Sequence, residues 1–402
     1  MTVVDEAGAA AAELLGSLNL ANPYPAYARL RSLAPVYVPP AGPVLVTSYA
    51  GVAAVLRSPL AHKNTDARMA VSGLPDWRDH PGLRLMFTSI LQLDDPDHGR
   101  LRATVSRVFT ARRVAAMRPV VHDIAARLIE SLLARGDSPV DLVAEWALPL
   151  PIEVIGDLLG VPAADRSAFA VLVHDFGLAL EPALGPAELG RCDAAAVGLT
   201  DYFRLLLAER RRAPTDDLTS SLLALELTDD ERITMLVLLF AAGFETTTQL
   251  LAKSVVALVS APGELQRWRA DPGLTGSAVE ELLRFDSPVQ MNSRILSADV
   301  PVGADVIPGG RIVFCCLGAA NRDPARYPDP DRLDLSRPDV RGMSFGGGAH
   351  FCLGAALARL EAAAALPMLF GAFDVALAGE PVLRPGLALH GFAELPVVLT
   401  AR

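Results

Sequence analysis

One cysteine near the end of the chain lies in a setting that favours thiol chemistry. The run Phe-Gly-Gly-Gly-Ala-His-Phe-Cys-Leu-Gly spans residues 345–354, and the Ala- and Leu-rich residues 353–370 predict a helix. A thiol at a helix N-terminus lies near free backbone N–H groups and the positive end of the helix dipole, which favours the thiolate. Cys352 is therefore a candidate nucleophile, redox thiol or axial ligand of haem iron.

A second candidate site lies inside a long apolar segment. Residues 228–231 fit a helix-capping box, and the pattern predicts a helix over 229–259 that crosses the interior. Glu245 and Thr246 lie near its middle, where unpaired polar groups are costly. They form either a solvated face with hydroxyls bonded back to helix carbonyls, or a functional pair. Gly243 should leave room for a ligand against the backbone.

Two further charged pairs have the spacing of neighbours on one helix face. Glu281 and Arg284 lie three residues apart, and His98 and Arg102 lie four apart behind an Asp-Pro helix start. The two donor groups of His98 and Arg102 suit a pair of carboxylates. Each residue taken singly also fits an ordinary surface charge or a satisfied core histidine.

Composition argues against several classes of protein. The chain has 402 residues, of which 51% are hydrophobic and 20% charged, and this suits a well-filled core rather than a disordered chain. The net charge of −10 argues against general nucleic-acid binding. We find no apolar stretch of the roughly 18 residues that span a membrane, and no secretory signal, so we expect a cytoplasmic protein. The four cysteines have neither zinc nor disulfide spacing.

Helical periodicity dominates the chain, and we predict a mainly α-helical single domain with small β-sheets. The predicted helices span residues 25–33, 49–57, 96–109, 114–135, 163–176, 186–211, 217–226, 229–259, 262–270, 277–285 and 353–370. The predicted extended segments lie near residues 36–46, 294–300 and 311–316.

These motifs together resemble those of the cytochrome P-450 family. The pattern Phe-x-x-Gly-x-x-x-Cys-x-Gly, with His two residues before the Cys, resembles the haem-binding loop of that family. The run Ala-Gly-Phe-Glu-Thr at 242–246 resembles its oxygen-binding groove. The resemblance covers nearly the whole chain and implies one catalytic domain over 1–402, with the cytochrome P-450 fold and a long central helix over the haem.

The resemblance assigns a role to each motif residue. Cys352 would be the axial ligand of haem b, iron protoporphyrin IX, while Thr246 and Glu245 would deliver protons during dioxygen activation. The expected cofactor-binding set also contains His98, Arg102, Arg294 and His350, which would bind the haem propionates, and Phe345, Gly348 and Gly354 of the cysteine loop. Glu281 and Arg284 would form a structural network with a third residue from a later loop, for which we take Arg332.

Substrate contacts in this family come from loops whose sequences vary. The expected substrate-pocket residues are Phe87, Leu91, Leu238, Leu239, Ala242, Val289, Met291, Asn292 and Phe392. Residues 177–190, rich in Ala, Leu, Gly and Pro, are expected to form a mobile lid.

The overall pattern is similar to that of actinobacterial enzymes that tailor polyketides, macrolides and other secondary metabolites. It predicts a monooxygenase that hydroxylates or epoxidises a medium-to-large apolar natural product with dioxygen. Electrons would come from a ferredoxin and its reductase, through a basic docking face built from Arg100, Arg107, Arg112, Arg113 and Arg359. The alternatives are a multistep oxidase, a desaturase, a C–C or C–O coupling enzyme, an enzyme acting on carrier-bound substrate, and a non-catalytic haem-thiolate sensor.

Overall fold

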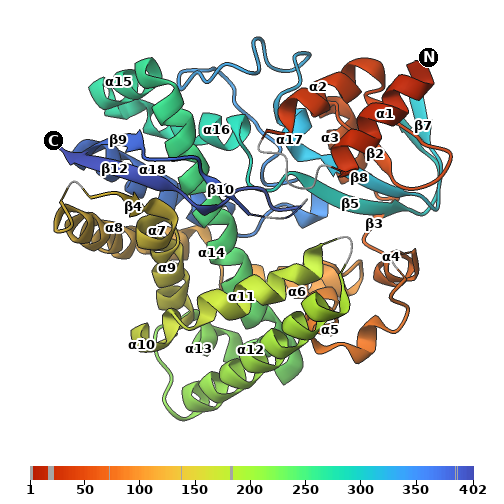
Figure 1. The fold of residues 1–402 in the computed structure, drawn as a ribbon. Helices are drawn as coiled ribbons and strands as arrows, with labels where there is room; N and C mark the ends of the chain where they lie inside the picture. Colours follow the sequence, from red (N-terminus) through yellow and green to blue (C-terminus); the bar gives the residue numbers. More distant parts are fainter. Residues whose placement is uncertain are drawn as a thin grey trace.

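The computed structural model describes residues 3–16, 22–71, 73–136, 138–181, 184–384, 386 and 388–402. Helices form most of the molecule, and the long helix α14 (Asp229–Ser260) runs through its middle (Figure 1). The N-terminal helices and a five-stranded sheet lie on one side of α14, and a small three-stranded sheet near the C-terminus lies on the other. The mainly helical architecture with small sheets confirms the prediction from sequence.

The element bounds follow in chain order. The other α-helices are α1 (Val3–Gly16), α2 (Tyr24–Leu33), α3 (Tyr49–Arg57), α4 (Thr65–Val71), α5 (Pro81–Phe87), α6 (Asp97–Ser106), α7 (Ala111–Ala116), α8 (Arg118–Leu133), α9 (Pro149–Leu159), α10 (Ala163–Arg166), α11 (Phe169–Gly177), α12 (Pro186–Arg212), α13 (Leu218–Leu223), α15 (Pro262–Ala270), α16 (Thr275–Phe285), α17 (Leu317–Asn321) and α18 (Ala355–Ala372). Short 3-10 or π turns are η1 (Trp77–Asp79), η2 (Val143–Ala147), η3 (Leu178–Leu180), η4 (Pro272–Leu274) and η5 (Gly348–His350).

The strands are likewise short. They are β1 (Val36–Tyr37), β2 (Val44–Val46), β3 (Ala61–His62), β4 (Val140–Asp141), β5 (Met291–Leu296), β6 (Val300–Val302), β7 (Asp305–Ile307), β8 (Ile312–Cys316), β9 (Phe373–Leu377), β10 (Val382–Leu383), β11 (Phe392–Glu394) and β12 (Pro396–Ala401).

The five-stranded sheet has the order β1-β2-β8-β5-β3. Its β2–β8 pair is parallel, and its other pairs are antiparallel. The register of β5 on β8 places Asn292 opposite Cys315 and Arg294 opposite Val313. Because side chains alternate along a strand, Asn292 and Arg294 share one face while Met291 points to the other. This sheet therefore fixes which residues of β5 can face the site.

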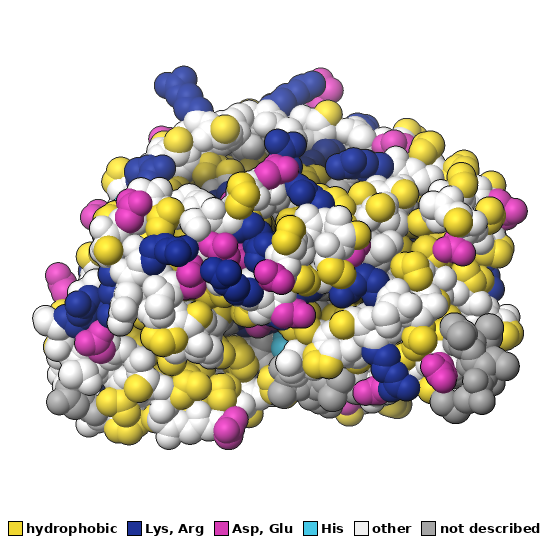
Figure 2. All heavy atoms as spheres, turned by 90° about the horizontal axis from the view of Figure 1, so that it is seen from above, with side chains coloured by type: hydrophobic (Ala, Val, Ile, Leu, Met, Phe, Trp, Pro, Cys, Tyr) yellow, Lys and Arg dark blue, Asp and Glu magenta, His cyan; other side chains and the backbone are white. Residues whose placement is uncertain are grey.

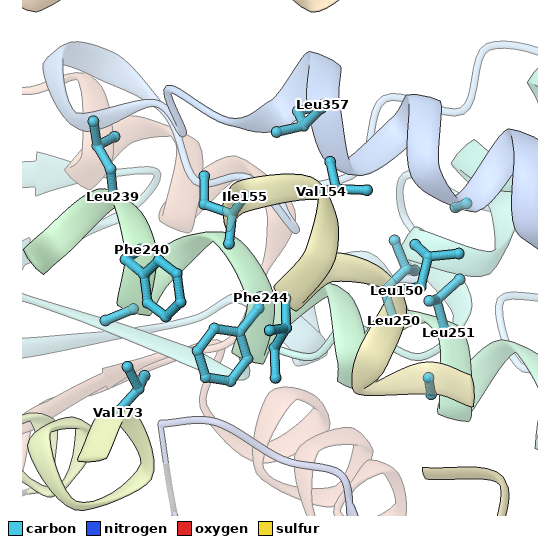
Figure 3. Packing of buried hydrophobic residues seen from close by; sticks show 14 of the residues in the cluster. Leu150, Val154, Ile155, Val173, Leu239, Phe240, Phe244, Leu250, Leu251 and Leu357 are labelled. Atoms are coloured by element: carbon cyan, nitrogen blue, oxygen red, sulfur yellow. The ribbon is translucent and has the colours of Figure 1, made fainter. Parts of the chain in front are cut away.

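Helix α14 has the start that its sequence predicts. The Thr228 hydroxyl accepts a hydrogen bond from the Glu231 N–H at 3.2 Å, and the Glu231 carboxylate accepts one from the Thr228 N–H at 2.8 Å. Its apolar side chains, among them Phe240 and Phe244, pack against Ile155 and other residues of α9 (Figure 3).

The role expected for Gly243 is wrong. A Cβ atom at this position would lie 2.8 Å from a side-chain carbon of Ile155. The missing side chain therefore allows close packing of α14 against α9 rather than room for a ligand.

Several boundaries differ from those predicted. The expected helix 114–135 is divided at Met117 into α7 and α8, and the expected helix 163–176 is divided into α10 and α11. Helix α9 was not predicted, and it contains Pro149 and Pro151, a residue type that breaks the interior of a helix. In the structure these prolines lie in its first turn, where the missing N–H has no helical partner to lose.

Within the described part of the chain, two helices are long and apolar enough to cross a membrane by length and composition. They are α14 and α18, whose most apolar windows are 72% and 56% buried inside the fold. The expectation that no apolar stretch reaches such a length is therefore wrong. The core helix of a globular protein passes the same test, so these two helices are weak grounds for a membrane span.

Candidate active site

The cysteine loop runs from η5 to the start of α18. The Cys352 N–H donates to the Phe345 carbonyl at 3.0 Å, which closes the loop. Gly348 has a positive φ of 67°. A Cβ atom there would lie 2.1 Å from the Leu56 carbonyl oxygen. Only glycine fits this position, and α18 begins at Ala355, three residues after the cysteine.

The electrostatic setting of Cys352 combines opposing effects. Burial raises the pKa of the thiol, while hydrogen bonds from the backbone at Gly354 and Ala355 and the charges of Arg102 and Arg359 lower it. Burial dominates, so the pKa of the free thiol lies above its usual value. Among the described residues no group of three or more His, Cys, Asp or Glu side chains could hold a metal ion. A metal ion at this site would therefore need a cofactor that supplies its other ligands, with the Cys352 thiolate as the ligand from the protein.

Several cationic groups gather beside the cysteine loop. Lys63 and Arg294 are buried, and both donate to the Asn292 side-chain oxygen, at 3.2 and 2.7 Å. The rings of His98 and His350 lie 4.1 Å apart, between their centroids. The buried Nε2 atom of His98 has no hydrogen-bond partner among the residues that the structure describes. Arg102 completes the group and donates to the Phe351 carbonyl at 2.7 Å. This set is called the cation cluster below.

Burial lowers the pKa of every member of the cation cluster, and the charges of other members lower the pKa of Lys63, His98 and His350 further. Burial lowers the pKa of Lys63, with Arg294 as the next cause. Burial together with Lys63 and Arg294 lowers the pKa of His350 to about 2. Asp94 opposes this field only in part, because its two oxygens accept from the Lys63 and Asn64 backbone N–H groups, both at 2.8 Å.

The cation cluster fits a ligand that carries carboxylates. Buried cations without an acidic partner are unfavourable, and a bound anion would remove both the repulsion and the unpaired His98 nitrogen. The predicted members His98, Arg102, Arg294 and His350 lie together, whereas Lys63 was missed. A signal was available, because Lys63 is one of only two lysines in a chain whose positive charge is otherwise arginine.

The acid and the alcohol of α14 have different partners. The Thr246 hydroxyl donates to the Ala242 carbonyl at 3.1 Å. Ala242 is exposed although it lies in the middle of a core helix, so α14 is not covered by other side chains at this point. The Glu245 carboxylate forms a very short ion pair with Arg384 and lies 3.8 Å from His174 Nδ1. Burial lowers the pKa of both Arg384 and His174.

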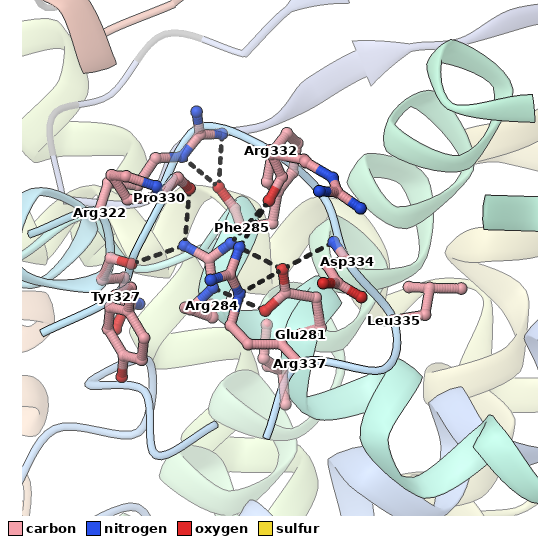
Figure 4. A network of polar contacts seen from close by, with 12 residues as sticks. Glu281, Arg284, Phe285, Arg322, Tyr327, Pro330, Arg332, Asp334, Leu335 and Arg337 are labelled. Carbon is pink, nitrogen blue, oxygen red and sulfur yellow. Dashed lines mark hydrogen bonds and ion pairs between the residues drawn. The ribbon is translucent and has the colours of Figure 1, made fainter. Parts of the chain in front are cut away.

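The Glu281–Arg284 pair forms the centre of a buried network (Figure 4). Arg284 donates twice to the Glu281 carboxylate, at 2.7 Å each, and both side chains are fully buried. The third side chain is Arg337, whose Nε lies 3.2 Å from Glu281 Oε1. The prediction of Arg332 is wrong: its side chain is exposed and points away, and only its carbonyl accepts from Arg284 and Arg337. Helical spacing fixes the first two residues, but nothing in the sequence distinguishes two arginines of one loop.

This network is tied to the cysteine loop. Arg284 donates to the Asn321 carbonyl at 2.9 Å, and the Asn321 side chain donates to Ser344 at 2.9 Å. Ser344 directly precedes Phe345, whose ring lies under the Arg359 guanidinium at 4.4 Å. The network therefore holds the start of the loop, as expected for a structural role.

Two predicted substrate residues lie elsewhere. Met291 packs with the N-terminal helices, and the Asn292 oxygen is taken by Lys63 and Arg294, so both assignments are corrected. Because successive side chains of β5 point to opposite faces of the sheet, Met291 and Asn292 lie on different faces. Five of the others are buried or partly buried apolar residues of the main core and remain predictions: Phe87, Leu91, Leu238, Leu239 and Phe392. Ala242 is exposed, and Val289 packs on the sheet-side core.

The lid and the docking face also remain predictions. Residues 182 and 183 of the expected lid lie outside the described residues, and α12 begins at Pro186. Three of the five arginines of the docking face have acidic partners: Arg100 with Glu231, Arg113 with Asp216 and Arg359 with Glu280. On the face drawn in Figure 2, the described basic and acidic side chains alternate without a large area of one sign.

Comparisons with known proteins find relatives that match nearly the whole chain. A family model described as Cytochrome P450 matches residues 200–393. Vitamin D(3) 25-hydroxylase of Pseudonocardia autotrophica is 40% identical over 399 residues, which is 95% of this chain and 94% of the relative. Cytochrome P450 monooxygenase PikC of Streptomyces venezuelae is 38% identical over 399 residues, covering 95% of this chain and 92% of the relative.

Solved structures are similar over the same length. P450BioI, in complex with an acyl carrier protein ligated to hexadec-9Z-enoic acid, aligns with a TM-score of 0.87 and 32% identity, over 94% of this chain and 98% of that chain. The cytochrome P450 PksS of the Bacillus subtilis bacillaene polyketide synthase aligns with a TM-score of 0.84 and 32% identity, over 94% and 97% of the two chains.

Proposed function

The chain belongs to the cytochrome P450 family, and we propose that it hydroxylates or epoxidises a medium-to-large apolar natural product of the polyketide or macrolide type. Members of this family are monooxygenases that bind haem through a cysteine thiolate. The observation that carries the proposal is the exposed turn of α14 at Ala242 and Thr246, which adjoins the apolar residues Leu238 and Leu239. The names of two relatives support it, since one is a vitamin D(3) hydroxylase and another, PksS, belongs to a polyketide synthase.

Haem would be held by groups that the chain already brings together. Cys352 would supply the thiolate ligand of the iron at the glycine-built turn before α18, which brings the N–H groups of Gly354 and Ala355 near the sulfur. The cation cluster would hold the two propionates, with Lys63 added to the residues expected from sequence. Asn292 would orient Lys63 and Arg294 through its side-chain oxygen.

When bound, haem supplies dioxygen activation and the transfer of one oxygen atom to the substrate. The residues of α14 manage the protons that this chemistry consumes. Thr246 holds a proton at Oγ1, and because its hydroxyl donates to Ala242 it keeps free lone pairs that can accept from water or a protonated group. Glu245, held by Arg384 and close to His174, connects that hydroxyl to polar groups on α11 and near the C-terminus.

Apolar side chains around the turn exclude bulk water from the substrate. Leu238 and Leu239 are 7% and 9% exposed, so the chamber recognises its substrate by shape and hydrophobic contact rather than by charge. A steroid-like or macrolide-like skeleton fits such a lining. One structural neighbour, CYP109E1 of Bacillus megaterium, was solved in complex with testosterone.

We infer that electrons come from a ferredoxin and its reductase and that the protein works in the cytoplasm. Arg107 and Arg112 are exposed and remain available for an acidic redox partner after the other arginines of the docking face are paired. A second candidate function is oxidation of a carrier-bound acyl chain. It is favoured by the similarity to P450BioI, which was solved with an acyl carrier protein.

The proposal is tested by spectra and turnover together. The reduced, carbon monoxide-bound protein should give the red-shifted Soret band of a haem thiolate, and Cys352→Ser should lose it. With ferredoxin, reductase and NADPH, the wild type should oxidise at least one of vitamin D3, testosterone and a macrolactone. An imidazole-like spectrum would refute the ligand, and absence of turnover on the free compounds, with turnover on a carrier-bound acyl chain, would favour the second candidate.

A further inference from the structure

One face of α14 holds a segment from the C-terminal end of the chain. Glu245, Gln249 and Lys253 follow one another at four-residue spacing, so they lie in a line along the helix. Each of them has a partner in the segment of β10, β11 and the loop that joins them. Residues 388–394 of that hairpin are called the return segment below.

Gln249 clamps the return segment by its backbone. Its side-chain nitrogen donates to the Phe392 carbonyl at 3.1 Å, and its side-chain oxygen accepts from the Phe392 N–H at 2.7 Å. The approach is so close that a Cβ atom at Gly391 would lie 1.9 Å from the Gln249 oxygen. Gln249 is 3% exposed, so neither bond competes with bulk water.

Lys253 provides a second attachment one turn later. Its Nζ lies 2.9 Å from His390 Nδ1 and 3.3 Å from the His390 carbonyl. The same nitrogen lies 2.8 Å from Asp286 and 3.1 Å from the Ser287 carbonyl. Lys253 is 1% exposed, and it therefore joins the return segment and the chain before β5 at one buried point.

The return segment is also bonded on its other side. The Gln290 N–H donates to the Ala388 carbonyl at 3.0 Å, and the His390 N–H donates to the Pro288 carbonyl at 2.9 Å. Val289, an expected substrate contact, pairs with Leu389 in an isolated bridge. The segment thus lies between α14 and residues 288–290.

We propose that Gln249 and Lys253 are positioning residues that hold the return segment as a fixed wall of the substrate chamber and thereby set which carbon of the substrate is oxidised. The inference rests on the proposed function, because it assigns the wall to the same chamber. The hairpin reaches the acid–alcohol pair through Arg384, which binds Glu245 and donates its N–H to the Gly391 carbonyl at 3.0 Å. A displacement of the return segment would therefore move the wall relative to Thr246.

The test compares two buried residues of one helical turn. Gln249→Leu removes both bonds to Phe392, whereas Thr248→Val removes only a hydroxyl that donates to the Phe244 carbonyl within α14 at 2.9 Å. Gly391→Ala disturbs the same contact from the hairpin and leaves the sequence of α14 unchanged. It replaces Gln249→Leu if that variant does not fold. Each holoenzyme is first checked for an unchanged carbon monoxide spectrum.

Two measurements decide the proposal. Hydrogen exchange at the Phe392 amide should be about 30-fold faster in Gln249→Leu than in wild type, the effect of losing two neutral hydrogen bonds, and unchanged in Thr248→Val. With testosterone and vitamin D3 as probes, the ratio of oxidised products should change in Gln249→Leu and Gly391→Ala but not in Thr248→Val. A merely structural defect would lower all products in proportion.

Faster exchange with an unchanged product ratio would overturn the positioning role, and equal exchange in Gln249→Leu and Thr248→Val would overturn the clamp itself. If wild-type protein oxidises neither these probes nor a macrolactone, the proposed function fails, while the exchange measurement still decides whether the clamp exists.

Discussion

Replacing Arg337 should destabilise the protein far more than replacing Arg332, although both arginines lie in the same loop. Arg337 donates to the fully buried Glu281 at 3.2 Å. It also donates to the carbonyls of Pro328, Asp329 and Arg332, at 2.6, 3.1 and 3.0 Å. The Arg332 side chain is exposed and outside this network.

The expected magnitude follows from these contacts. A hydrogen bond to a charged buried group contributes about 1.5–3 kcal/mol, and the three carbonyl bonds add to this. Removing the only partner of a buried charge costs about 3–5 kcal/mol, but Glu281 keeps its two bonds to Arg284. We therefore expect Arg337→Met to lower the free energy of unfolding by about 3 kcal/mol, and Arg332→Met to change it by less than about 0.5 kcal/mol.

The assay is urea unfolding of the holoenzyme, followed by circular dichroism and by the haem absorbance. Because Arg284 and Ser344 link the network to the cysteine loop, Arg337→Met should also release haem at lower urea concentration than Arg332→Met. Equal unfolding midpoints for the two variants, or a larger loss in Arg332→Met, would refute the assignment of Arg337 to the Glu281 network.

Two further predictions concern the acid–alcohol pair and the cation cluster. Thr246→Ala should retain haem but divert electrons to hydrogen peroxide, measured as product formed per NADPH; unchanged coupling would remove Thr246 from proton delivery. In haem-free protein the pKa of His350 is about 2, below the value of about 6.5 in an unfolded chain, so the unfolded state alone gains a proton as the pH falls below about 6.5. Stability of the haem-free protein should therefore fall by up to about 2 kcal/mol between pH 6.5 and 5, whereas bound propionates should reduce this loss; identical pH dependence of the urea midpoint with and without haem would contradict the expectation.

Features set by short sequence spacing were predicted well. The capping box at Thr228 and Glu231, the pairing of Glu281 with Arg284 and the glycine-built turn at Cys352 depend on neighbours within a few residues. Local backbone geometry determines which of these side chains are neighbours, and the rest of the chain has little effect on this. The resemblance to a family added the expectation that these local motifs meet in one site.

Features that depend on distant segments could not be read in this way. Lys63 joins the cation cluster from the end of β3, and Arg384 reaches Glu245 from the far end of the chain. Met291 and Asn292 differ by one position in a strand, and only the register of β5 on β8 decides which of them faces the site. The sequence shows that side chains alternate along a strand, but it does not show which of the two sets faces the site.

The cation cluster links stability of the fold to its cofactor. Folding brings Lys63 and Arg294 into a buried site where Asn292 is their shared acceptor, and no carboxylate side chain among the described residues bonds them directly. The folded chain alone must therefore hold mutually repelling charges, and a ligand with two carboxylates removes that repulsion only in the folded state. Binding to the folded state alone stabilises it in proportion to the logarithm of ligand concentration over Kd. The buried Lys63 and Arg294 thus mark the position at which an anionic group of the cofactor would bind.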